Sequence, residues 1–142
     1  MSLLHRITAT FFFSGICCFL LSVQVAFAEV EVKNQNGIAY VSGGVGKDQQ
    51  EAVERLGKEF TLKVTLASHE GHYLSDGKII VKNDAGEPVL EVTGAGPIIY
   101  VDLAPGTYTL LADVASLAGQ TEERSITIGE SQVTESFVWR TE

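Results

Sequence analysis

Residues 60–68 alternate between apolar and polar side chains almost without exception. A chain with a side-chain period of two places one set of residues on each face, so the segment is predicted to be a half-buried β-strand. Its apolar face is formed by Phe60, Leu62, Val64 and Leu66. A strand of this kind needs partner strands and a second layer, which commits the surrounding chain to a β-fold.

Further short segments with β-branched or aromatic residues follow at near-regular spacing. They read KIIVKN, PVLEVTG, PIIYVDL, TYTLLADVA, RSITIGE and QVTESFVWR. Turn-forming residues separate them at 83–86, 94–97, 104–106 and 118–120. With the apolar run IAYVS, the pattern predicts a mainly β domain of about seven to eight strands and one short N-terminal helix. Such spacing is typical of an antiparallel sandwich or barrel.

The segment 38–58 begins this domain with an apolar run, a glycine-rich turn and a helical pattern. Asp48 and Glu51 form a D-x-x-E variant of the capping box, which predicts a helix that opens near Gln49. At helical spacing the residues Ala52, Val53, Leu56 and Phe60 share one face. We therefore expect a strand, a turn and a helix at the entry to the sandwich.

The same turn ends in Gly46-Lys47, as a phosphate-binding loop does. The G-x-x-x-x-G-K-[ST] motif also needs a glycine at position 41 and a hydroxyl at position 48. The chain has Val41 and Asp48 there, and a carboxylate would repel phosphate. We expect no nucleotide binding.

The first 28 residues have a basic start, a long apolar run and a small-residue exit, which is the pattern of a secretory signal peptide. Ala26 and Ala28 form the A-x-A cleavage site. An uncleaved membrane anchor is the alternative, but the core of the run is short for a membrane span. Cleavage after Ala28 would leave residues 29–142 as the mature domain.

The charge and cysteine content narrow the partners and the compartment. The chain carries a net charge of −8, which argues against nucleic acid and against anionic membrane surfaces. Both cysteines, Cys17 and Cys18, lie in the signal segment, so the mature domain would have no disulfide. An exported domain without cysteines fits the periplasm, with secretion from the cell as the alternative.

The segment from residue 77 to about residue 128 resembles the carboxypeptidase regulatory-like domains, which are transthyretin-like β-sandwiches. The resemblance rests on a hairpin with Asp84 and Gly86 and on an L-x-P-G-x-Y sequence that contains Pro105, Gly106 and Tyr108. It implies a Greek-key sandwich of transthyretin-like or immunoglobulin-like type and no particular activity. Pro105-Gly106 would form a tight turn, and the Tyr108 hydroxyl would bond to nearby backbone as in a tyrosine corner.

His69 and His72, the histidines of the mature domain, are the weak candidates for metal ligands. Their spacing of three differs from the H-E-x-x-H pattern, and Gly71 between them disfavours a helix. Side chains three apart on a strand point to opposite faces, so only a folded loop could bring both rings to one ion. We expect a polar connection between strands, with no metal and no other cofactor.

The sequence shows no catalytic motif. There is no G-x-S-x-G elbow, and the chain ends FVWRTE where the transthyretin-related hydrolase has Tyr-Arg-Gly-Ser. The leading hypothesis is a non-enzymatic module that binds or supports another periplasmic or envelope protein, with an edge strand as one possible contact. The alternative is a carbohydrate or small-ligand module, for which the candidate aromatic residues are Tyr40, Tyr73, Tyr100, Phe137 and Trp139. The hydrolase is a third candidate.

Overall fold

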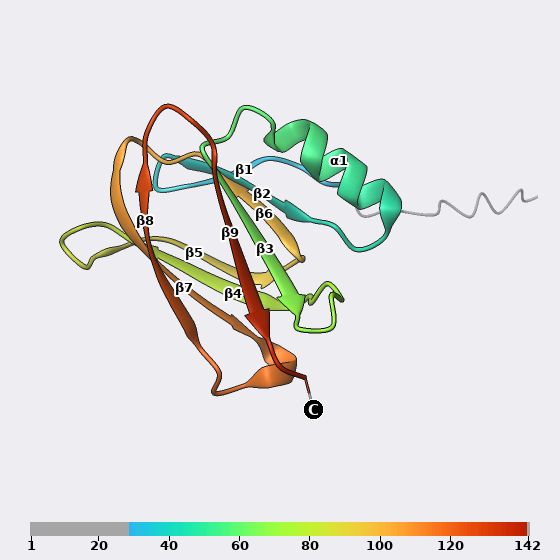
Figure 1. The fold of residues 1–142 in the computed structure, drawn as a ribbon. Helices are drawn as coiled ribbons and strands as arrows, with labels where there is room; N and C mark the ends of the chain where they lie inside the picture. Colours follow the sequence, from blue (N-terminus) through green and yellow to red (C-terminus); the bar gives the residue numbers. More distant parts are fainter. Residues whose placement is uncertain (1–28, 142) are drawn as a thin grey trace, which may run out of the picture.

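The computed structural model describes residues 29–141, which form nine strands and one α-helix in two packed sheets (Figure 1). The predicted mainly β sandwich is confirmed, with nine strands in place of seven to eight. The predicted signal peptide, with Ala26 and Ala28, lies outside the described residues. Within residues 29–141 no helix has the length and apolar character that a membrane span requires.

The strands divide into a five-stranded and a four-stranded sheet. In spatial order the first sheet contains β1 (Lys33–Gln35), β2 (Ile38–Gly43), β6 (Ile98–Val101), β3 (Leu62–Ser68) and β9 (Val133–Trp139). The second contains β5 (Pro88–Ala95), β4 (Gly77–Lys82), β7 (Gly106–Val114) and β8 (Glu122–Ile128). Helix α1 (Lys47–Gly57) follows β2, and the 3₁₀ turn η1 (Ala115–Leu117) follows β7.

One strand pair is parallel, so the prediction of an entirely antiparallel sandwich is wrong at this point. Strand β9 runs beside β3 in the same direction, with Leu62 opposite Val133 and Ser68 opposite Trp139 (Figure 1). The chain reaches β9 by crossing from β8 in the other sheet, and a connection between sheets does not impose the direction that a hairpin would. The other strand pairs within residues 29–141 are antiparallel.

The core lies between the two sheets and follows the alternation of the sequence. Leu62, Val64 and Leu66 of β3 are fully buried, and Lys63 and Thr65 between them are not. Phe137 and Trp139 of β9 are also buried and stack on each other, with ring centroids 6.1 Å apart. Each such side chain contributes about 1.5–3 kcal/mol through its removal from water, so the alternation stabilises the sandwich.

Helix α1 packs on the outer face of the first sheet, over β2 and β6 (Figure 1). Its Val53 joins Val41, Ile98 and Tyr100 in a second, smaller apolar cluster. The predicted helix is therefore present, but its predicted capping box is wrong. The helix begins at Lys47 with Gly46 as N-cap and no side-chain cap, so Asp48 and Glu51 lie inside the helix.

The reason for the earlier helix start is the backbone of Gly46, which has φ +83°. Glycine adopts this conformation without steric cost, so the chain turns into the helix two residues before Asp48. The Gln49 side chain then accepts a hydrogen bond from the Val45 N–H, at 3.2 Å. The Gln50 side chain donates to the Gly44 carbonyl, at 3.1 Å. These glutamine contacts fix the entry of the helix in place of the predicted box.

The turn before β7 has the local geometry that the P-G-x-Y sequence predicts. The Tyr108 hydroxyl donates to the carbonyl of Ala104, four residues upstream, at 2.8 Å. The Tyr108 ring is partly buried against the main core. Pro105 precedes Gly106, the first residue of β7, so the Tyr108–Ala104 hydrogen bond spans the Pro-Gly turn.

Candidate functional site

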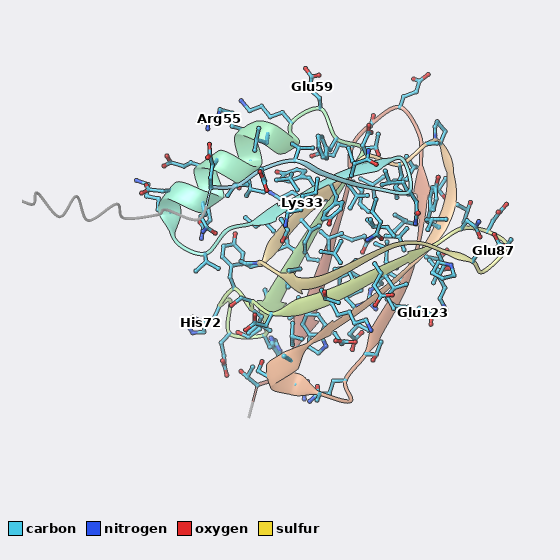
Figure 2. All side chains as sticks on the ribbon, turned by 180° about the vertical axis from the view of Figure 1, so that it is seen from behind. Lys33, Arg55, Glu59, His72, Glu87 and Glu123 are labelled. Atoms are coloured by element: carbon cyan, nitrogen blue, oxygen red, sulfur yellow. The ribbon has the colours of Figure 1, made fainter. Side chains whose placement is uncertain are left out.

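The two histidines lie at the end of β3 and in the loop that follows it. Ser68 closes this loop: its N–H donates to the His72 carbonyl at 2.7 Å, and its hydroxyl accepts from the His72 N–H at 3.2 Å. The His69 N–H donates to the Trp139 carbonyl at 2.7 Å. Figure 2 shows His72 at the outer margin of the molecule. No group of three potential His, Cys, Asp or Glu ligands occurs within residues 29–141.

The aromatic candidates do not form an exposed platform. Phe137 and Trp139 are buried, as is Tyr100, which packs edge-on against Phe60. Tyr40 is partly buried, and Tyr73 alone among the five is largely exposed, at 50%. A sugar-stacking surface needs accessible rings, and these residues mostly serve the core instead.

Lys47, the lysine of the nucleotide-like turn, is the first residue of α1 and is highly exposed. Its ammonium group lies 3.8 Å from the Glu51 carboxylate, one helical turn away. An exposed ion pair of this kind stabilises a helix by only about 0.3–0.5 kcal/mol. The lysine is thus a solvated helix residue in this structure.

Several elements share a groove of about 650 Å³. It lies between the N-terminal segment with β1 and β2 on one side and the edge strand β5 on the other. Figure 2 shows the molecule from behind, with Lys33 of β1 at the centre of the view and Glu87 at the tip of the β4–β5 hairpin. The volume of the groove is within the range of small-ligand pockets, about 300–1,000 Å³.

Strand β5 is the edge of the four-stranded sheet, and its outward backbone groups meet side chains instead of a strand. The Glu91 N–H donates to Gln35 Oε1 at 2.7 Å, and the Glu91 carbonyl accepts from Gln35 Nε2 at 3.2 Å. The carbonyl of Val89 accepts from Asn36 Nδ2 at 3.2 Å. The amide of Gln35 therefore bonds to Glu91 in the two-point manner of a neighbouring peptide group.

Gln35 and Asn36 hold these positions because they belong to a tight hairpin. Asn36 and Gly37 both have positive φ, 53° and 79°, which is the type I′ turn that joins β1 to β2. The Gly37 N–H also donates to Asn34 Oδ1 at 3.1 Å. The turn places Gln35 at the end of β1 facing β5, and so links the two sheets without a strand between them.

The other two long edge strands, β8 and β9, lie at the opposite side of the sandwich. Residues 129–132 connect β8 directly to β9, so these two edge strands lie at the same side. The Arg124 guanidinium lies 5.5 Å from the centre of the Phe137 ring, and the Trp139 indole donates to the Gln120 carbonyl at 2.7 Å. Strand β1 has only three residues. Among the described edge strands the eight-residue β5 is the longest.

The groove beside β5 is acidic. It is lined by one ammonium group, from Lys33, and by the carboxylates of Glu29, Glu31, Asp76 and Glu91. Glu91 forms a partly exposed ion pair with Lys78 at 3.3 Å. The lining has no histidine or cysteine, and Ser42 uses its hydroxyl to accept from the Gly96 N–H at 2.8 Å. A cationic ligand therefore suits the groove better than an anionic one.

Sequence reasoning missed this site. Asn36-Gly37 is the strongest short hairpin signal, and it could have identified β1 and its turn. No local pattern could have shown the contact of Gln35 with Glu91, because the two residues are 56 positions apart.

Comparison with known protein families and with curated proteins finds no match for this chain. The resemblance to carboxypeptidase regulatory-like domains therefore stays a prediction.

Proposed function

We propose that the chain is exported to the periplasm and that residues 29–142 form a non-catalytic module that binds another envelope protein. The observation that carries this proposal is the edge of β5, where the side-chain amides of Gln35 and Asn36 form hydrogen bonds with the backbone groups of Val89 and Glu91. An exposed sheet edge is a common site for an added peptide strand. The absence of an exposed aromatic cluster among the five candidate residues favours this function over sugar binding.

The second candidate is a small-ligand module, and the volume of the groove favours it. Its lining argues for the protein partner, because ligand pockets are mostly apolar with a few polar groups and this groove is rich in carboxylates. A hydrolase has less support. The groove lacks the histidine that would activate a serine, and His69 and His72 do not line it.

The localisation is tested by mass spectrometry of the protein isolated from the cell. We expect the mature chain to begin at Glu29, because Ala26 and Ala28 form a signal-peptidase site. An intact N-terminus on a protein that stays with the membrane would exclude the periplasmic assignment.

The function is tested by affinity capture from native periplasmic extract with the tagged, exported protein. We expect one protein to be retained at stoichiometric level and to bind again when both components are purified. A protein that retains only a sugar polymer or a small molecule would favour the second candidate. Turnover of an ester or amide substrate would contradict the non-catalytic assignment.

A further inference from the structure

We propose that the partner presents an extended, basic segment that pairs with β5 and displaces the amides of Gln35 and Asn36. This inference deepens the proposed function by naming the contact strand and the chemistry of the partner. It starts from the two hydrogen bonds between the Gln35 side chain and the backbone of Glu91. A peptide group of an incoming strand would supply the same donor and the same acceptor.

Replacement of the Gln35 and Asn36 amides by the backbone of an added strand should cost little free energy. Each amide–amide bond that Gln35 or Asn36 loses is replaced by an amide–amide bond of the same type from the partner backbone. The freed side chains return to water, and the hairpin that carries them stays joined to β2 through the pairs Lys33–Tyr40 and Gln35–Ile38. Displacement of the two amides therefore breaks no strand ladder of the free protein.

The register of β5 fits an added strand. Leu90 and Val92 are buried in the core, while Glu91 and Thr93 are exposed on the other face. Register shifts with β4 lie on both sides of this segment, between the pairs Gly77–Ala95 and Ile79–Val92 and between the pairs Val81–Leu90 and Lys82–Pro88. The regular part of β5 that an added strand can follow therefore runs from Leu90 to Val92, with Glu91 at its centre.

The charge of the groove selects the sequence of the partner. Four carboxylates line the groove, and they are opposed by the Lys33 ammonium group and, at Glu91, by the ion pair with Lys78. The groove keeps a negative charge even with the α-ammonium group that cleavage before Glu29 would add, so lysine or arginine at alternate positions of the added strand would meet opposite charge. A second copy of this chain is a poor occupant, because its β5 edge would bring Glu91 and no basic residue to the acidic groove. The occupant is therefore a segment of a different protein.

The probe for the test is a blocked eight-residue peptide of alternating Lys and Val, titrated into the exported protein by calorimetry and ¹⁵N NMR. We expect saturable binding with shifts at the amides of Glu91 and Thr93. Two control peptides separate charge from strand pairing. Glu in place of Lys should abolish binding, and a peptide with the same lysines and two internal prolines should also fail, because proline cannot complete a ladder.

Three protein variants complete the test. Gln35→Ala removes the competing amide with its two hydrogen bonds to Glu91 and should bind the Lys–Val peptide at least about fivefold more tightly. Glu91→Pro removes the outward N–H and should abolish binding. Glu91→Gln keeps that N–H and should bind detectably, with less salt dependence. If Glu91→Pro does not fold, the Gln35→Ala affinity and the Glu91 shifts still decide the question.

Several results would overturn this inference. Equal binding of the proline-containing peptide would show electrostatic contact without strand pairing. Preferential binding of the Glu–Val peptide, or dimers of the protein joined through β5, would show another occupant. A captured periplasmic partner that binds Glu91→Pro as well as the unmodified protein would leave the proposed function intact and refute this site.

Discussion

Gly57, the last residue of helix α1, lies directly against the ring of Tyr100 on β6. A β-carbon at Gly57 would overlap the ring carbons. The ring has little freedom to move, since Phe60 packs against it edge-on with centroids 6.4 Å apart and Lys63 lies 5.7 Å from its centre. This contact sets how closely the helix approaches the sheet.

Gly57→Ala should therefore destabilise the protein. Alanine gains about 1 kcal/mol over glycine in a helix, but overpacking costs about 1–3 kcal/mol, and a rigid ring places this site at the upper end. We expect a net loss of about 1–2 kcal/mol in the free energy of unfolding, measured by denaturant titration.

The matched control is Gly129→Ala, because no atom lies within 4 Å of a β-carbon at that exposed position. It should change stability by less than about 0.5 kcal/mol. Removing the ring should also relieve the overlap, so Gly57→Ala should become neutral or stabilising beside Tyr100→Ala. Equal losses with and without the ring would contradict this account.

Tyr108→Phe should remove the hydrogen bond to the Ala104 carbonyl, which is 2.8 Å long. The expected cost is about 1 kcal/mol, because the ring keeps its packing and the carbonyl loses one partner. Thermal unfolding of the variant beside Tyr73→Phe measures it. Tyr73 is 50% exposed, and its change should cost less than about 0.5 kcal/mol. A similar loss at both positions would mean that the tyrosine bond does not stabilise the turn.

The elements that follow from local pattern were predictable, and those that depend on distant contacts were not. The alternation around Leu62 and Val64 reports directly which face is buried, so β3 and the sandwich follow from sequence. The P-G-x-Y turn is also local, since Tyr108 bonds a carbonyl four residues away. The parallel pairing of β3 with β9 depends on the crossover between sheets, which residue pattern does not encode.

The capping box at Asp48 failed for a different reason. The sequence contains two signals for the start of the helix, the capping box at Asp48 and the glycine-rich turn before it. The helix begins at the turn, because Gly46 adopts a positive φ without steric cost. The site was missed because its central contact joins Gln35, at the end of a three-residue strand, to an edge strand of the other sheet. Only the assembled sandwich brings these residues together.

The hairpin that positions Gln35 can be tested through its turn. Gly37 has φ +79°, and a β-carbon at this position would meet no other atom within 4 Å. Gly37→Ala would therefore be strained by its backbone conformation alone. The left-handed conformation costs a residue with a β-carbon about 1–2 kcal/mol. We expect that loss in chemical denaturation, together with faster hydrogen exchange of the Glu91 amide as Gln35 is displaced. An unchanged stability would contradict the type I′ turn.

The last prediction concerns His69 and His72. Zinc prefers four ligands in a tetrahedron, and within residues 29–141 no three candidate ligands lie close enough together to hold an ion. The loop between the two histidines is already fixed by backbone bonds, from Gly71 N–H to the Ser68 carbonyl at 2.9 Å and from Ser68 N–H to the His72 carbonyl. We expect calorimetry with zinc or copper to show no stoichiometric binding tighter than about 10 μM, since that affinity already requires about 7 kcal/mol from the site. The control is the double variant His69→Ala/His72→Ala, which should give the same weak signal as the unmodified protein. One equivalent bound at submicromolar affinity, and lost in the double variant, would show that the loop rearranges around a metal and would make this end of β3 a second functional site.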